Sequence, residues 1–139
     1  MQQQYRYDKR TSKARKLSLN RARGTFQEGV ALLEKGFCTG AVNRFYYAAF
    51  YAARALLATK ELDSSKHRGV IALFHEHFVR TDLVNSEIAK TLSRSFEQRQ
   101  DFDYEDFISA TTEDAESVRE RVKQFMNECE MAFRKIKNQ

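Results

Sequence analysis

Arg99 and Asp103 stand four residues apart in the segment SFEQRQDFDYEDF (95–107), where an amphipathic pattern runs into charged residues. At about 100° per residue, a helix continued this far places Arg99 about 20° to one side of Leu92 and Asp103 about 20° to the other. Leu92 belongs to the apolar face of that helix, so both charged residues are predicted to face the core. A buried guanidinium is costly unless a carboxylate and further acceptors receive it.

Two interpretations of this pair are open, and the helical period favours neither. In the structural one, an Arg99–Asp103 ion pair locks the junction between the fourth helix and the last. In the functional one, Arg99 binds phosphate in a groove between two subunits, Asp103 sets its orientation and Tyr104 lies beside it. A planar guanidinium suits the second role, because it matches the oxygen geometry of phosphate.

The histidines and cysteines give no metal site. His67 ends an apolar face, where a lone histidine is more often a hydrogen-bonded structural residue than a catalyst. His75 and His77 are two residues apart and therefore point in different directions on a helix. Cys38 and Cys129 follow no metal-ligand spacing, and two reduced thiols are the simpler interpretation, with a disulfide left open. No metal or cofactor is predicted.

The elements that position these residues are predicted to be helices. The first spans about residues 9–35 and stops at Gly36. The second, GAVNRFYYAAFYAARALLATK (40–60), is capped by Thr39 and is apolar nearly all round, which places it inside a bundle. Its alanines allow neighbouring helices to approach closely.

One face of the second helix differs from the rest, because polar groups recur there at steps of three and four. The residues on this face are Asn43, Tyr47, Phe50 and Arg54. The three tyrosines of the helix are interpreted as core aromatics with hydroxyl groups reaching the surface: Tyr46, Tyr47 and Tyr51.

A third helix is predicted over 65–80, opened by Asp63 or Ser64, and a fourth is capped by Asn85 or Ser86. A last helix is predicted over about 105–135. The buried positions expected of the first, third and fourth helices are Leu19, Ala22, Phe26, Val30 and Leu33; Val70, Ile71, Phe74 and Phe78; and Ile88, Ala89, Leu92 and Phe96.

The fold class that follows is all-α, an up-and-down bundle of four main helices plus a short extra one. The absence of proline and the presence of only 5 glycines in 139 residues argue against hairpins and sandwiches. The length predicts one domain over 1–139. No apolar run reaches the roughly 18 residues of a membrane span and no signal-peptide pattern opens the chain, so a cytoplasmic protein is expected.

Positive charge is concentrated at the amino terminus. Residues 1–23 hold eight Lys and Arg against Asp8 alone, although the whole chain carries a net charge of only +5. Nucleic acid is one candidate partner for such a segment. A solvated helix face preceded by a frayed basic tail over 1–8 is the alternative.

Three segments together resemble the HEPN family (higher eukaryotes and prokaryotes nucleotide-binding). They are AVNRFYYAAFYAARALL (41–57), SKHRGVIALFHEHFV (65–79) and RQDFDY (99–104), and the resemblance extends over roughly residues 10–135. It is most like small stand-alone prokaryotic members, which implies an α-helical bundle and a homodimer. It also implies a minimal nucleotidyltransferase as partner in a toxin–antitoxin-like system, and nucleotide or RNA as ligand.

Many members of this family are metal-independent ribonucleases with an arginine followed, after four to six residues, by a histidine. Arg99 matches that arginine, but Asp103 or Tyr104 stands where the histidine would be, and no histidine follows His77. An imidazole titrates near neutral pH and neither replacement does. The resemblance therefore implies binding first, with an endoribonuclease using a non-standard site as an alternative and a structural dimer or adaptor as a second one.

The predicted site residues differ between the binding and the catalytic interpretation. Binding would use Arg99 with the residues Asn43, Arg44, Lys66 and His67. Catalysis would use Arg99, Asp103 and Tyr104, with His67 as a relocated base or acid.

Overall fold

The chain folds into helices only, in the parts that the structure describes. The computed structural model describes residues 9–104 and 109–137, and for 9–18 and 100–104 the backbone alone. The elements are α1 (Lys9–Glu34), α2 (Cys38–Ala58), α3 (His67–Phe74), the π-helical turn η1 (His75–Val79), α4 (Ser86–Tyr104) and α5 (Thr112–Lys137). The predicted all-α bundle of four main helices and a short one is confirmed.

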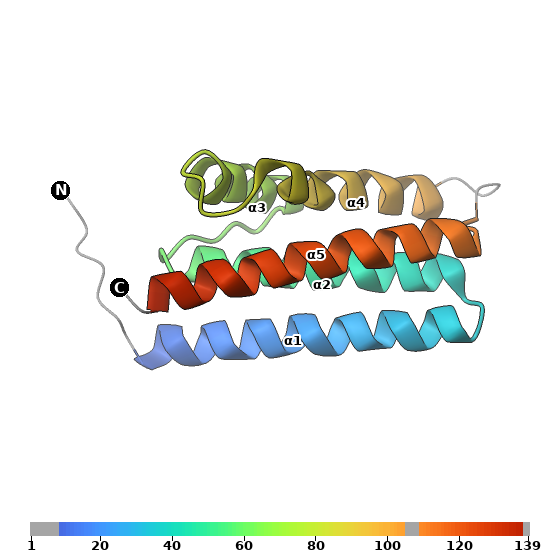
Figure 1. Cartoon of the computed structure of the whole chain (residues 1–139), viewed down its shortest axis with the longest axis horizontal. Helices are drawn as coiled ribbons and strands as arrows, with labels where there is room; N and C mark the ends of the chain where they lie inside the picture. Colours follow the sequence, from blue (N-terminus) through green and yellow to red (C-terminus); the bar gives the residue numbers. More distant parts are fainter. Residues whose placement is uncertain (1–8, 105–108, 138–139) are drawn as a thin grey trace.

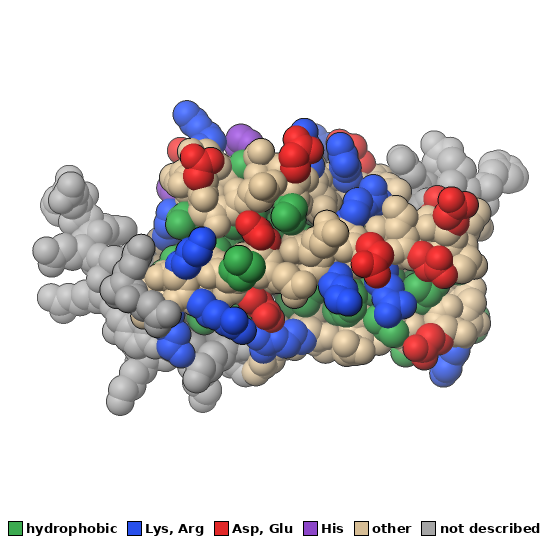
Figure 2. Space-filling view, in the orientation of Figure 1, with side chains coloured by type: hydrophobic (Ala, Val, Ile, Leu, Met, Phe, Trp, Pro, Cys, Tyr) green, Lys and Arg blue, Asp and Glu red, His purple; other side chains and the backbone are tan. Residues whose placement is uncertain are grey.

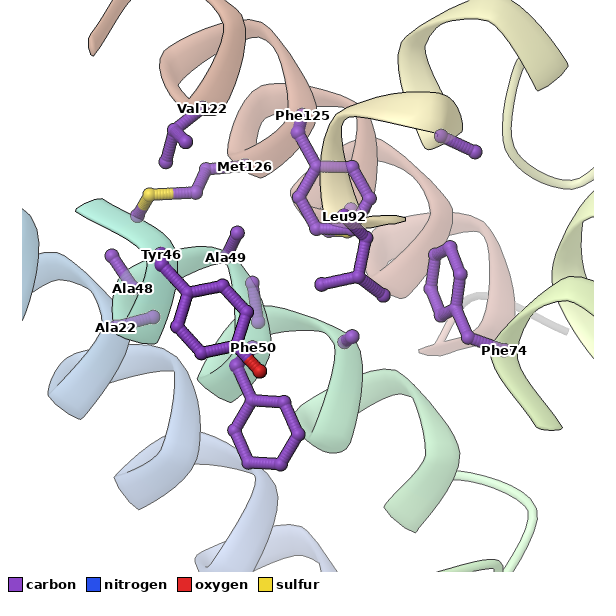
Figure 3. Packing of buried hydrophobic residues seen from close by; sticks show 14 of the residues in the cluster. Ala22, Tyr46, Ala48, Ala49, Phe50, Phe74, Leu92, Val122, Phe125 and Met126 are labelled. Carbon is purple, nitrogen blue, oxygen red and sulfur yellow. The ribbon is translucent and has the colours of Figure 1, made fainter. Parts of the chain in front are cut away.

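α2 is the central element (Figure 1), and both α1 and α5 pack against it. Phe45 and Tyr46 are fully buried together with Ala48 and Ala49, which confirms the central placement predicted from its apolar circumference. Figure 3 shows Tyr46, Ala48 and Ala49 of α2 between Ala22 of α1 and the α5 side chains that complete the core. The α5 members are Val122, Phe125 and Met126.

The α1–α2 contact depends on a glycine. A Cβ added at Gly29 would lie 2.6 Å from Cε1 of Phe45, a ring that is itself fully buried. Gly29 therefore lets the two helices approach over the Phe45 ring. At the end of α1, Gly36 adopts a φ of +83°, and the N–H of Phe37 donates to the Leu32 carbonyl, which closes the helix as predicted.

Two predicted caps are wrong. The residue preceding α2 is Phe37, and the Thr39 hydroxyl instead accepts a hydrogen bond at 3.1 Å from the N–H of Ala110, just before α5. α3 starts at His67, after Lys66, rather than at Asp63 or Ser64. In both cases the polar side chain that was expected to cap a helix accepts a hydrogen bond from a loop N–H instead.

The start of α4 is as predicted, because Asn85 Oδ1 accepts hydrogen bonds from the N–H groups of Glu87 and Ile88. The last helix begins later than predicted. Thr111 and Asp114 form a capping box, each side chain accepting from the other's backbone N–H at 3.0 and 2.9 Å, and α5 therefore starts at Thr112. Residues 105–108 lie outside the described part of the chain.

The expected apolar faces of α1, α3 and α4 are confirmed. Leu19, Val70 and Leu92 are buried, and the remaining stripe residues are buried or packed against the core from its edge. None of the described helices combines the length and the apolar character of a membrane span. That 1–139 forms one domain stays a prediction, and the tail 1–8 lies outside the described residues.

Candidate functional site

Arg99 lies on the inner side of α4 and is half-buried between α4 and α2. Its guanidinium carbon lies 5.2 Å from the centroid of the Tyr46 ring and 5.4 Å from that of Tyr47, and its Nη1 donates to Tyr47 Oη at 3.3 Å. The predicted inward turn of Arg99 is therefore confirmed. The receiving surface is aromatic, and a cation over a ring face is stabilised by the ring quadrupole.

Tyr46 connects Arg99 to a histidine. Its hydroxyl oxygen lies 2.6 Å from Nδ1 of His67, and Arg99 is also hydrogen-bonded to the Tyr46 side chain. Burial raises the pKa of Tyr46 well above its ordinary value, while the positive charge of Arg99 acts in the opposite direction. The phenol therefore keeps its proton at neutral pH. Because a guanidinium can only donate to this oxygen, the Tyr46 proton is directed to His67 Nδ1.

His67 stacks on Phe50, with 4.4 Å between ring centroids, and also lies near the Phe96 ring of α4. The pKa of His67 is lowered, first because burial disfavours the imidazolium and then because Arg99 and Arg54 are positively charged. The site thus holds a neutral imidazole next to a cation. We call the six residues of this assembly the α2–α4 cluster: Tyr46, Tyr47, Phe50, His67, Phe96 and Arg99.

Further arginines lie over neighbouring rings of α2. The guanidinium carbon of Arg44 lies 5.1 Å from the Tyr47 centroid, and that of Arg21 lies 4.3 Å from the Tyr51 centroid. The Arg44 guanidinium also donates to Asn43 Oδ1 at 3.0 Å. Three arginines from α1, α2 and α4 therefore lie over the side of α2 that carries Tyr46, Tyr47 and Tyr51, which we call the tyrosine face.

Arg54 is the fourth arginine at this face, and its guanidinium pairs with the Asp63 carboxylate. It makes a two-bond contact with Asp63, Nη2 to Oδ2 at 2.7 Å and Nε to Oδ1 at 3.1 Å. The hydrogen bonds from Arg54 lower the pKa of the Asp63 carboxyl, against the effect of burial. This contact joins α2 to the loop that precedes His67 and so helps to place the imidazole.

Four of the five predicted binding residues come together. Arg99 and His67 share Tyr46, Arg99 and Arg44 share Tyr47, and Asn43 holds Arg44. Lys66 is exposed at the start of α3, and its described hydrogen bond runs from its backbone N–H to Ser64 Oγ. The side chains of Asp103 and Tyr104 lie outside the described part of the structure, so the predicted roles of both residues stay predictions.

Tyr46 and Tyr47 are the site residues that sequence reasoning missed, because both were interpreted as core aromatics although Tyr47 was also placed on the polar-tipped face of the helix. The available signal was their proximity in phase to Asn43 and Arg54 on the polar-tipped face of α2. Within the described residues, no group of three or more His, Cys, Asp or Glu side chains is arranged to hold a metal ion. Cys38 and Cys129 are free thiols, and burial raises the pKa of Cys129.

The chemistry that this geometry offers is anion binding and stacking. A guanidinium can receive phosphate oxygens, and the part-exposed rings of Tyr47 and Tyr51 can receive bases, whereas Tyr46 is fully buried. A neutral imidazole can accept or pass on a proton.

The chain is similar in sequence to known proteins over most of its length. The HEPN domain family matches residues 16–132. A "UPF0332 protein" of Thermotoga maritima is 37% identical over 117 residues, which cover 84% of this chain and 89% of that protein. The proteins named "Putative toxin MJ0142" and "Putative toxin MJ0605" of Methanocaldococcus jannaschii are also similar. The first is 31% identical, covering 78% of this chain and 74% of its own length. The second is 34% identical, covering 76% and 78%. The chain therefore belongs to the HEPN domain family.

Proposed function

We propose that this chain is a HEPN-type module that binds nucleotide or RNA through Arg99 and the tyrosine face of α2. The observation that carries the proposal is the position of Arg99, half-buried over Tyr46 and Tyr47 with Arg44 over the same Tyr47 ring. Charge for phosphate and ring faces for bases thus occur on one surface, the combination used to bind single-stranded nucleic acid.

A partner and a second copy belong to the same proposal. Two relatives carry the word toxin in their names, which supports a toxin-like role for this chain. We place it in a toxin–antitoxin-like pair with a minimal nucleotidyltransferase, as a homodimer in the cytoplasm whose subunits face each other across the Arg99 groove. Asp103 orients Arg99 in this proposal and Tyr104 lies nearby.

A second function, metal-independent RNA cleavage, is favoured by one observation. The His67 imidazole and the Arg99 guanidinium are hydrogen-bonded to the same side chain, that of Tyr46, although the histidine expected after Arg99 is absent. Cleavage through the 2′-hydroxyl needs a base for its proton, a donor to the leaving 5′-oxygen and positive charge at the phosphate. Because Nδ1 accepts the Tyr46 proton, His67 carries its own proton on Nε2 and would be the donor to the leaving 5′-oxygen, with Arg99 at the phosphate and Asp103 as the base.

The test uses purified wild-type protein and its Arg99→Ala variant, with fluorescein-labelled single-stranded RNA and nucleotides as probes. We expect Arg99→Ala to weaken binding at least tenfold, because the variant cannot form a charge-assisted hydrogen bond to phosphate. Thermal unfolding of the same samples should show a folded variant with a modest loss of stability, because its contacts with Tyr46 and Tyr47 are removed. If the pair with Asp103 were purely structural, the variant would instead lose about 3–5 kcal/mol of stability.

Arg94→Ala is the matched control, since Arg94 is an exposed arginine on another face of α4. Equal RNA affinity for wild type and Arg99→Ala, or no affinity of the wild type for any probe, contradicts the binding proposal. Cleavage is followed on the same RNA in EDTA. Products ending in a 2′,3′-cyclic phosphate that disappear in His67→Gln would support the second function.

A further inference from the structure

A groove runs between α1 and α5, away from the α2–α4 cluster. Both helices pack on α2 rather than closely on each other (Figure 1). Arg21, over Tyr51, and Arg23 are two residues apart and so point about 200° away from one another on α1. α1 therefore separates the tyrosine face from this groove.

Two adjoining hollows form the groove. One, of about 340 Å³, has Leu19 and Phe133 among its lining, and the other, of about 270 Å³, has Phe26 and Met126. They meet at the ion pair of Arg23 and Glu130, whose Nη2 and Oε1 atoms lie 2.8 Å apart. Among the described lining residues, the groove thus has an apolar floor that the Arg23–Glu130 ion pair crosses.

The rim of the groove is basic. Its charged lining residues are Arg23, Lys123, Arg134 and Lys137 against Glu130. Figure 2 shows these kinds of side chain along the border of α1 and α5, with blue side chains flanking a red one. A ligand with a negative face therefore suits the rim.

An exposed apolar residue extends the groove outward. Met131 is 52% exposed, and it lies on the α5 face that holds the lining residues Asn127 and Arg134, four residues before and three after it. From Lys123 to Lys137 the lined part of α5 spans 14 residue steps, or about 21 Å at 1.5 Å per residue. About four turns of a guest helix fit that length.

We infer that this groove docks an acidic amphipathic helix of a partner protein. The apolar face of the guest covers Phe26, Met126 and Phe133, and its carboxylates meet Lys123, Arg134 and Lys137. This is the helix-in-groove mode, in which apolar anchors recur at three- and four-residue steps. A nucleic acid would meet the same rim charges, but the floor includes the aliphatic side chains of Leu19 and Met126, on which bases do not stack, which is why protein is favoured over RNA.

The docking inference does not depend on RNA binding at Arg99. Either one can be contradicted by experiment while the other holds. The test places the photo-crosslinker p-benzoylphenylalanine at Asn127 in the full chain, expressed at its natural level in its own cells. The crosslinked product is sequenced by mass spectrometry. We expect a peptide with apolar residues at helical spacing and carboxylates on the other face. The same crosslinker at exposed Ala72 of α3 should not yield that peptide.

Charge reversal tests whether the crosslink depends on the basic rim of the groove. Arg134→Glu with Lys137→Glu should remove most of the Asn127 crosslink, and reversing the guest's carboxylates to lysine should restore it. Arg80→Glu, at an exposed position elsewhere, should leave the yield unchanged. Arg134→Gln with Lys137→Gln repeats the test should the reversed variant fold poorly. A crosslink to RNA, to a second copy of this chain or to a peptide without an acidic face overturns the inference, as does no crosslink.

Discussion

The hydroxyl group of Tyr46 determines how the candidate site is held together. A buried phenol needs hydrogen-bond partners, and Tyr46 finds His67 on one side and Arg99 on the other. Each partner comes from a different helix, so one side chain of α2 fixes α3 and α4 together. Substituting lysine for Arg99 would not preserve this arrangement, because an ammonium lacks the planar fork that contacts Tyr46 and Tyr47 together.

The lowered pKa of His67 predicts a pH dependence of stability. In the unfolded chain a histidine titrates near pH 6.5, whereas folding lowers the pKa of His67 below that value. The unfolded state therefore takes up the proton first, and the free energy of unfolding falls as pH drops through about 6.5, levelling off below the folded pKa. Urea unfolding of wild type and His67→Gln between pH 5 and 8 checks this.

The expected result is a smaller loss of stability at low pH in His67→Gln than in the wild type. His75→Gln is the control, since His75 is exposed and off the apolar face, and it should retain the wild-type profile. The charged groups facing His67 are Arg99 and Arg54, and both oppose its protonation. Parallel profiles for wild type and His67→Gln would contradict the electrostatic account of this residue.

At the scale of the helix, α2 combines two roles on different sides. Phe45 and Ala49 are buried in the core, whereas Tyr47 and Arg54 keep part of their surface open. The open side carries the rings that receive the arginines. Because the helix is rigid and held by neighbours on both sides, these rings are presented in a fixed arrangement.

Two glycines of α1 give a prediction with a built-in control. In Gly29→Ala the new Cβ would lie 2.6 Å from the buried Phe45 ring, and we expect a loss of about 1–3 kcal/mol from overpacking. In Gly24→Ala nothing lies within 4 Å of the new Cβ, and we expect a gain of about 0.5–1 kcal/mol from helix propensity. Chemical denaturation of both variants provides the comparison. Stabilisation by both substitutions would show that the Phe45 ring yields easily.

The side of a regular helix on which a residue lies was predictable from the sequence, because the helical period alone determines it. Arg99 on the inner side of α4 and Val70 on that of α3 are examples. The cap at Thr39 was mispredicted because its hydroxyl accepts from the N–H of Ala110, a contact that sequence proximity cannot reveal. The cap at Ser64 was mispredicted because its hydroxyl accepts from the N–H of Lys66, two residues on, in a local turn that ends before α3 begins. The contact of Tyr46 with His67 depends on the path of the intervening loop, which no periodic pattern specifies.

At the scale of the whole molecule, two surfaces lie on opposite sides of α1. The tyrosine face with Arg21 and Arg99 carries cations over rings, and the groove with Arg23 carries cations around an apolar floor. A ligand at one surface leaves the other accessible. Under the two proposals made above, the molecule would hold a nucleic acid at one surface and a partner protein at the other at the same time.

The basic amino-terminal segment adds a last test at this scale. Lys9 and Arg10 begin α1, so truncation at residue 16 would remove turns of helix as well as charge. Replacing the basic residues of these turns with glutamine removes charge alone. The positions are Lys9, Arg10, Lys13, Arg15 and Lys16.

If these five side chains bind RNA phosphates, each substitution by glutamine should reduce the slope of log K against log salt by about 0.7 for a single strand. The full set would then reduce the slope by up to about 3.5. Fluorescence anisotropy with labelled single-stranded RNA between 50 and 300 mM KCl measures both slopes, and Arg99→Ala serves as the comparison at the site itself. An unchanged slope and affinity in the glutamine variant would assign the segment to solvent and leave Arg99 and its neighbours as the proposed nucleic-acid contact.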